Sequence, residues 1–282
     1  MGVHRKRALR AAGAAGAAAL GTLLYGVAIE PRRVAVRRVT LRPRAWTKAL
    51  DGLRVGVIGD LHAGGPGVGA ERVGRWVTAL NALEPDIVLI PGDLTDPQVL
   101  FGEWTEPEPI AEALGGLRAP LGRIAVLGNH DITNDAPRIE RALRSAGIVV
   151  LDDSAVELAA PAPLWVAGIS DMRTRAPNPD AALADVPTEA AVIAVTHDPD
   201  VFPRVPSRVA LTVAGHMHGG QVAIPLLQRP FLPSRFGARY RSGVVEELGR
   251  LLYVTTGAGQ AGMPLRLGVP PEIALLELRS GG

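Results

Sequence analysis

The 282-residue chain contains no cysteine. This absence excludes disulfide bonds, thiolate metal ligands and a cysteine nucleophile. Any bound metal must therefore be held by imidazole, carboxylate, amide or water ligands, which suit manganese, iron, zinc or cobalt better than copper(I) or iron–sulfur clusters. The sequence shows no internal repeat. Its 33 glycines and 24 prolines lie mostly between apolar runs, as turn residues do, and not in one repetitive tract. With 47% hydrophobic residues, it can form a sizeable globular core.

Basic residues are unevenly distributed along the chain. The first 48 residues carry eleven lysines and arginines and one acidic residue, which leaves residues 49–282 with 19 basic and 27 acidic residues, a net charge of −8. An acidic body argues against a broad phosphate-tracking surface, so we expect no nucleic-acid partner. The basic leader is instead suited to contact with anionic lipid or with export machinery.

The leader has the layout of a signal-anchor over residues 1–30. An uncharged run of 19 residues, Ala11–Ile29, follows a basic cluster. No A-x-A cleavage site comes after it, so we expect residues 11–29 to be retained as an anchor in the cell membrane. The basic cluster also resembles a degenerate twin-arginine signal, with Lys6 in place of the second arginine. The alternative, a helix buried in the body, is disfavoured by Gly13, Gly16 and Gly21.

Charge alone does not orient this segment. Four arginines between residues 32 and 38 oppose the basic residues before the run under a positive-inside count. Apolar residues interleaved with them predict a short strand, however, so these arginines can belong to the folded protein. We expect residues 31–48 to form a basic linker and first strand, residues 49–282 to form the main domain, and that domain to lie on the exported face.

The body reads as an α/β protein. Short β-branched runs alternate with polar clusters, and helical spacing predicts helices at Ala70–Leu83 and Ala136–Ala146. Later runs lie closer together with fewer helices between them, which favours a four-layer α-β-β-α sandwich of two mixed sheets over a single doubly wound sheet. The predicted strands are Leu53–Ile58, Ile87–Ile90, Ile124–Leu127, Trp165–Ile169, Val192–Val195, Val209–Val213, Leu251–Thr255 and Ile273–Leu278.

Five of the six histidines lie in polar clusters at the ends of apolar runs. The carboxyl end of a buried strand is where α/β folds place chemistry, and a glycine before the ligand allows a sharp turn. One such histidine alone is more often a hydrogen-bonded core residue than a catalytic one, but five together point to a site. The clusters are Gly59-Asp60-Leu61-His62, Gly92-Asp93, Gly128-Asn129-His130-Asp131, Thr196-His197-Asp198 and Gly215-His216-Met217-His218.

In this order the clusters resemble the signature of the calcineurin-like metallophosphoesterases, which is D-x-H, GD, GNH(D/E), H and GH-x-H. Gly219-Gly220-Gln221, Pro233-Ser234-Arg235 and the downstream Pro264–Gly268 and Pro270–Glu272 segments resemble a membrane-anchored bacterial branch that includes phosphodiesterases and UDP-diacylglucosamine hydrolase-like proteins. Gly59 stands where this branch usually has serine, and Met217 where it often has threonine. Neither departure removes a ligand.

The resemblance implies two divalent metal ions, manganese, iron or zinc, and a role for each predicted residue. One metal falls to Asp60, His62 and His218, and the other to Asn129, His197 and His216, with Asp93 bridging the two. A metal-bridging hydroxide would attack phosphorus. His130 is then the catalytic residue that donates a proton or hydrogen bond to the leaving oxygen, and Asp131 is a candidate to orient it. For Asp131 and Asp198, a local turn or cap role is the alternative.

The implied reaction is phosphoester hydrolysis, by a phosphodiesterase or pyrophosphatase. The anchor favours a phospholipid or nucleotide-sugar lipid as substrate, with the membrane and a small phosphoester or phosphorylated lipid as partners. A broad-specificity phosphomonoesterase, a nuclease and a non-catalytic scaffold are alternatives, and the oligomeric state is not predicted. Basic and aromatic residues after the last ligands suggest a lip for a phosphorylated lipid, or an ordinary solvated loop. They are Arg229, Phe231, Arg235, Phe236, Arg239, Tyr240 and Arg241.

Overall fold

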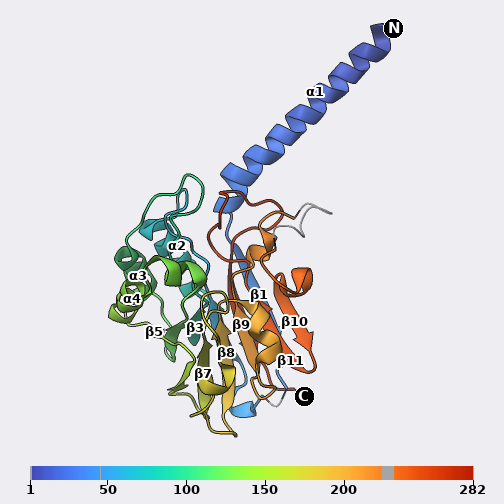
Figure 1. The fold of residues 1–282 in the computed structure, drawn as a ribbon. Coiled ribbons are helices and arrows are strands. Elements are labelled where there is room, and N and C mark those ends of the chain that lie inside the picture. The colour runs from blue at the N-terminus through green and yellow to red at the C-terminus, as the bar shows by residue number, and fades with distance from the viewer. Residues whose placement is uncertain (1, 45, 224–231, 282) are drawn as a thin grey trace.

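The N-terminal helix projects from the folded body in the computed structural model, which describes residues 2–44, 46–223 and 232–281 (Figure 1). Helix α1 (Gly2–Leu24) continues into a π-helical turn, η1 (Tyr25–Ile29), and a 3₁₀ turn, η2 (Glu30–Arg32). The segment from His4 to Arg32 is long and apolar enough to cross a membrane, and only 6% of its most apolar stretch is buried. The helix is therefore not part of the core of the body.

Two six-stranded mixed sheets form the centre of the described body. In the first sheet β12 runs antiparallel to β2, and the strands from β2 to β5 run parallel. In the second, β7, β8, β9 and β11 run parallel between two antiparallel edge strands. In order across each sheet, the strands are β1 (Ala35–Leu41), β12 (Glu272–Leu278), β2 (Leu53–Val57), β3 (Ile87–Ile90), β4 (Gly122–Ala125) and β5 (Val149–Val150), then β10 (Gly243–Glu247), β11 (Arg250–Val254), β9 (Leu211–Ala214), β8 (Ala191–Thr196), β7 (Leu164–Ile169) and β6 (Ser154–Leu158).

Helices cover the outer face of each sheet. On the first sheet, α2 (Ala70–Asn81), α3 (Pro107–Gly115) and α4 (Asn129–Ser145) bury one apolar stripe each. The cover of the second sheet is thinner, with α5 (Pro179–Ala182) and the 3₁₀ helix η4 (Pro199–Arg204) packed against it. Facing side chains of the two sheets form a third apolar layer between them. The remaining short turns are η3 (Lys48–Leu50), η5 (His218–Gly220) and η7 (Gly237–Tyr240).

This arrangement confirms the predicted α-β-β-α sandwich, with differences at individual elements. Helix α4 begins at Asn129, seven residues before the predicted start, because its polar first turns carry no apolar stripe; non-helical backbone at Asp135 separates them from the apolar part. Helix α3 was not predicted, since two prolines interrupt its short pattern. Neither were the edge strands β5, β6 and β10, in which only Val150 and Leu158 are buried. The elements that the sequence did not predict are therefore short, or have only a few buried side chains.

The topology brings the predicted site together. Strands β2, β3 and β4 of one sheet and β8, β9 and β11 of the other run in the same direction within their sheets, so that their carboxyl ends form one edge each. Every predicted polar cluster follows one of these strands. A ligand set drawn from both sheets therefore assembles at one end of the sandwich.

Candidate metal centre

Five predicted site residues adopt left-handed backbone conformations that residues other than glycine rarely occupy. The φ angles are +49° at Asp60, +46° at His62, +55° at Asp93, +68° at His216 and +47° at His218. Such conformations cost about 1–3 kcal/mol each and persist where the surrounding structure enforces them, often at functional sites. Here they bend the chain immediately after strands β2, β3 and β9 and direct the side chains inward.

The glycines that precede two clusters are required by close approach of a carboxylate. A Cβ atom at Gly128 would lie 2.1 Å from Asp93 Oδ1, and one at Gly215 would lie 2.7 Å from Asp60 Oδ2. The carboxylates take up this space and accept backbone hydrogen bonds there: Asp93 from the His130 N–H at 2.9 Å, and Asp60 from the His216 N–H at 3.0 Å. Larger residues at either glycine would displace these carboxylates.

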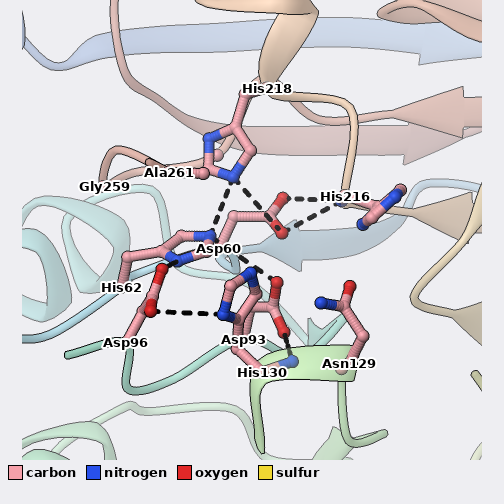
Figure 2. Close-up of polar contacts among 12 residues, drawn as sticks. Asp60, His62, Asp93, Asp96, Asn129, His130, His216, His218, Gly259 and Ala261 are labelled. Atoms are coloured by element: carbon pink, nitrogen blue, oxygen red, sulfur yellow. Dashed lines mark hydrogen bonds and ion pairs between the residues drawn. The ribbon is translucent and has the colours of Figure 1, made fainter. Parts of the chain in front are cut away.

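The candidate ligand atoms converge in three overlapping groups, as Figure 2 shows for most of these side chains. Within each group all ligand atoms lie within 4.8 Å of one another. Asn129 joins the third group, because its Oδ1 lies 3.1 Å from His197 Nε2. All eight predicted residues are thus brought to one place. The groups are Asp60, His62 and His218; His62, Asp93 and His130; and Asp93, His197 and His216.

The donor set fits divalent cations. His62 Nδ1 lies 3.0 Å from Asp96 Oδ2 and His197 Nδ1 lies 2.7 Å from the Pro91 carbonyl. When a cation is bound, the Nδ1–H of each ring can donate to these acceptors, which leaves Nε2 as the ligand atom. His197 Nε2 lies 3.0 Å from His216 Nδ1 and 3.2 Å from Asp93 Oδ2, while His216 Nε2 has no hydrogen-bond partner. Imidazole nitrogens and carboxylate oxygens that point at one another are ligands for manganese, iron or zinc.

His218 is the candidate ligand whose hydrogen bonds favour the tautomer that does not bind a cation through Nε2. Its Nδ1 lies 3.1 Å from Nη2 of Arg266, a fully buried guanidinium that has only donors. Accepting from Arg266 leaves the His218 proton on Nε2, which faces His62 Nε2 at 2.8 Å. Cation binding through Nε2 requires the opposite tautomer, in which Arg266 gives up this contact and keeps the carbonyls of Thr256, Gly259 and Val269.

Asp96, a fully buried carboxylate beside two site histidines, was not among the predicted site residues. One of its oxygens faces His62 Nδ1, and the other lies 3.2 Å from His130 Nδ1, at ion-pair distance but without hydrogen-bond geometry. The available signal was a second aspartate three residues after Asp93, in Gly92-Asp93-Leu94-Thr95-Asp96. Asp96, not Asp131, is the carboxylate that faces His130.

Asp131 supports the backbone of the site. Its carboxylate accepts hydrogen bonds from the N–H groups of Asp93 at 2.8 Å, Leu94 at 2.8 Å and Gly128 at 3.0 Å. These contacts join the turn after β3 to the start of α4. Asp198, for which the sequence allowed a turn or cap role, caps η4 by accepting from the Asp200 N–H. Its carboxylate also pairs with Arg173 at 3.2 Å.

The pKa values of Asp60 and Asp93 are shifted in opposite directions. Burial, reinforced by the charge of Asp93, outweighs the opposing His197 and raises the pKa of Asp60 to about 6. Burial acts in the same direction on Asp93, but the imidazoles of His197, His62 and His130 outweigh it and hold the Asp93 pKa well below its usual range. Asp93 is therefore ionised at neutral pH, as a metal ligand must be.

The pKa values of the site histidines are also shifted in opposite directions. Burial and nearby positive groups hold the pKa values of His216 and His218 well below the usual value, which keeps both rings neutral. Burial also disfavours the charged form of His197, but the adjacent Asp93 overcomes it and raises the His197 pKa well above its usual value. For His130, likewise, the carboxylates of Asp96 and Asp93 outweigh burial and raise the pKa. His130 can therefore carry a proton near neutral pH.

A cavity of about 550 Å³ opens over the site. Part of its lining, which we term the polar floor, consists of His62, Asp93, His130, His216 and His218. The apolar part of the lining, which we term the apolar wall, includes Met217, Val222, Met263 and Leu265. The cavity therefore presents candidate metal ligands and apolar surface to the same ligand.

Five of the seven residues of the predicted basic and aromatic lip belong to the described part of the chain. Arg229 and Phe231 lie outside the described residues. Of the rest, Tyr240 is fully buried and Arg239 is paired with Glu247, while the backbone N–H of Arg235 donates to Asp200. Phe236 is 39% exposed. Most of the described lip is therefore engaged in structure.

Comparison with known proteins agrees with this site. The family model for calcineurin-like phosphoesterases matches residues 53–230, which is more than half of the chain. The chain therefore belongs to the calcineurin-like phosphoesterase family and is a metallophosphoesterase-type hydrolase. The family depends on divalent metals, and this chain has the clustered histidines and aspartates that could hold them.

Three relatives place the chain more closely. It is 32% identical to a transmembrane protein with metallophosphoesterase domain from Danio rerio, over 91% of this chain and 60% of that protein. It is 26% identical to the uncharacterized metallophosphoesterase YkuE of Bacillus subtilis, over 94% of both chains. It is 32% identical to the phosphodiesterase YaeI of Escherichia coli, over 69% of this chain and 71% of that protein. A transmembrane relative and the apolar α1 together point to membrane anchoring.

Proposed function

We propose that the protein hydrolyses phosphodiesters or pyrophosphates with two divalent cations. Asp60, His62 and His218 would hold one cation, and Asn129, His197 and His216 the other, with Asp93 as ligand to both. The observation that carries this proposal is the approach of two ring nitrogens, His62 Nε2 and His197 Nε2, to the same Asp93 oxygen, Oδ2, at 3.6 and 3.2 Å. Manganese, iron and zinc all suit this donor set.

Bound divalent cations supply Lewis-acid activation of a phosphoryl group and of a water nucleophile. The chain's own residues do the rest. His130 stands on the polar floor with a raised pKa, so it can donate its proton to the leaving oxygen. Asp96 stabilises the protonated form of His130. His216 and His218 are neutral ligands, so they would not cancel the positive charge of the bound cations, which would attract the phosphate anion.

We further propose an amphiphilic substrate, a phospholipid or a nucleotide-sugar lipid. The support is the apolar wall, which lines the same cavity as the polar floor and suits an acyl chain or other apolar group attached to phosphate. The apolar α1 would hold this cavity near the bilayer. In this proposal residues 1–30 are the anchor, residues 31–48 the connection and first strand, and residues 49–282 the catalytic domain on the exported face.

The test is turnover by the full chain in detergent, after loading with manganese, iron or zinc. The panel contains bis(p-nitrophenyl) phosphate, p-nitrophenyl phosphate, a nucleotide-sugar, a phospholipid and single-stranded DNA. We expect diesters to be cleaved faster than the monoester, and the lipid to have the lowest KM. Fast cleavage of the monoester alone would assign a phosphomonoesterase, and cleavage of DNA alone a nuclease.

His130→Ala separates catalysis from metal binding on the same panel. We expect turnover to fall by about 10²–10⁴-fold, the usual worth of a general acid, with both metals retained. Asp185→Ala, which removes an exposed carboxylate remote from the site, is the control and should leave turnover unchanged. Full activity of His130→Ala would assign proton donation to another group, and inactivity of the metal-loaded wild type on every substrate would favour a scaffold.

A further inference from the structure

Four large apolar side chains are exposed on two neighbouring loops. Leu100 is 52%, Phe101 80% and Trp104 48% exposed on the loop between β3 and α3, and Met263 is 47% exposed on the loop between β11 and β12. Only 4% of the chain is aromatic, so two solvated aromatic residues within four positions are a marked concentration. Exposure of this kind costs solubility unless something covers it.

The two loops are joined by their backbones. The Leu100 N–H donates to the Gly262 carbonyl at 2.7 Å, and the Glu103 N–H donates to the Gly64 carbonyl at 2.8 Å beside the site. Phe101 has a φ of +62°, which turns the chain sharply at the tip. The loop is thus held in a defined shape, with its apolar side chains outward.

The second loop is also bound to the base of the apolar helix. The Arg266 N–H donates to the Gly26 carbonyl at 2.9 Å, and the Gly268 N–H donates to the Glu30 carboxylate at 2.9 Å. Leu265 packs so closely on Gly26 that a Cβ there would lie 2.6 Å from its Cδ1. Both loops therefore lie at the end of the body from which α1 leaves, as Figure 1 also shows.

We propose that Leu100, Phe101, Trp104 and Met263 form a membrane-contact surface that enters the interfacial region of the bilayer crossed by α1. Aromatic and long apolar side chains are the groups that favour this region. The turns that continue α1 are hydrogen-bonded to the loop that carries Met263. Insertion of the helix would therefore also bring this surface to the bilayer. Arg32 and Arg33, at the base of the helix, lie at the level where cations meet lipid headgroups.

This contact would turn the cavity toward the lipid. Met263 belongs both to the membrane-contact surface and to the apolar wall, so the cavity mouth borders the proposed contact. An amphiphile could then enter the cavity from the bilayer without crossing water. The inference depends on the proposed anchoring by α1, and its test does not measure hydrolysis.

The absence of native cysteine permits single nitroxide labels in the full chain. The labelled variants are Phe101→Cys and Leu100→Cys, reconstituted into vesicles of phosphatidylethanolamine and phosphatidylglycerol. Electron paramagnetic resonance would measure relaxation of each label by oxygen, which partitions into lipid, and by a water-soluble nickel chelate. Leu20→Cys in α1 is the lipid reference. Leu248→Cys is the water reference, since it is 90% exposed in the β10–β11 hairpin, at the amino end of β11 and therefore opposite the site.

We expect the labels at positions 100 and 101 to resemble the Leu20 label, with relaxation by nickel several-fold weaker than at position 248. Nickel relaxation equal to that at position 248, with the Leu20 label in lipid, would overturn the membrane contact and leave the anchor intact. A Leu20 label accessible to nickel would overturn both. Hydrolysis of soluble bis(p-nitrophenyl) phosphate by the same variants is measured separately, so loss of the contact is distinguished from loss of the proposed activity.

Discussion

The polar floor and the apolar wall of the same cavity are built in different ways. Of the five floor residues, three are buried and four have left-handed backbones, and their side chains lie in contact with one another. The wall includes Met263, which is 47% exposed and contacts its surroundings through a flexible apolar side chain. The floor therefore acts as a unit in which one change alters several groups, whereas we expect the wall to contribute in small, separable amounts.

The strongest test of this contrast is Asp93→Ala. The Asp93 carboxylate lies within reach of His62, His197 and the His130 backbone, so its loss removes a ligand from both proposed cation positions. We expect both metals to be lost and turnover to fall by at least about 10³-fold, since metal activation is worth several kcal/mol. Elemental analysis and turnover on one sample would measure this. Retention of both metals would show that Asp93 does not bridge them.

A smaller effect is expected from Asp96→Asn, which keeps the shape of the side chain but removes its charge. The amide can no longer stabilise the His62 ligand as a carboxylate does, so affinity for the first cation should fall by about 10–100-fold. The substitution also removes the main group that raises the His130 pKa. If protonated His130 is the acid, the alkaline limb of the pH–rate profile should therefore move to lower pH.

Asp131→Asn is the matched control for this variant. Asp131 is as buried as Asp96, but its carboxylate accepts hydrogen bonds from backbone N–H groups and does not face His130. It should lower the melting temperature without moving the alkaline limb. An unchanged limb in Asp96→Asn would mean that Asp96 only fills space beside His62.

These predictions involve residues that sequence reasoning reached to different depths. Asp60, His62 and Asp93 were predicted because each follows a strand that is apolar on both faces. Asp96 was missed because its role depends on the turn at Asp93, whose positive φ folds the chain back toward His62. Spacing along the sequence does not reveal such a return.

Arg266 illustrates a second limit. Its segment was noted as a marker of a family branch, yet a lone arginine between leucines predicts a solvated side chain. In the structure it is fully buried and binds carbonyl groups of the loop that also meets α1. Contacts of this kind join residues distant in sequence and depend on the complete fold, as do the edge strands β6 and β10, which patterning left out.

The smallest expected effect belongs to the wall. Met263→Gln preserves length and removes most of the apolar character of a half-exposed side chain, so the loss of contact with an acyl chain should be about 1 kcal/mol. This predicts a KM for a long-chain phospholipid that is raised by about 5-fold, with kcat unchanged. Bis(p-nitrophenyl) phosphate, which has no acyl chain, should be cleaved as by the wild type. An equal loss on both substrates would mean that Met263 supports the floor, and the contrast between floor and wall would fail at this residue.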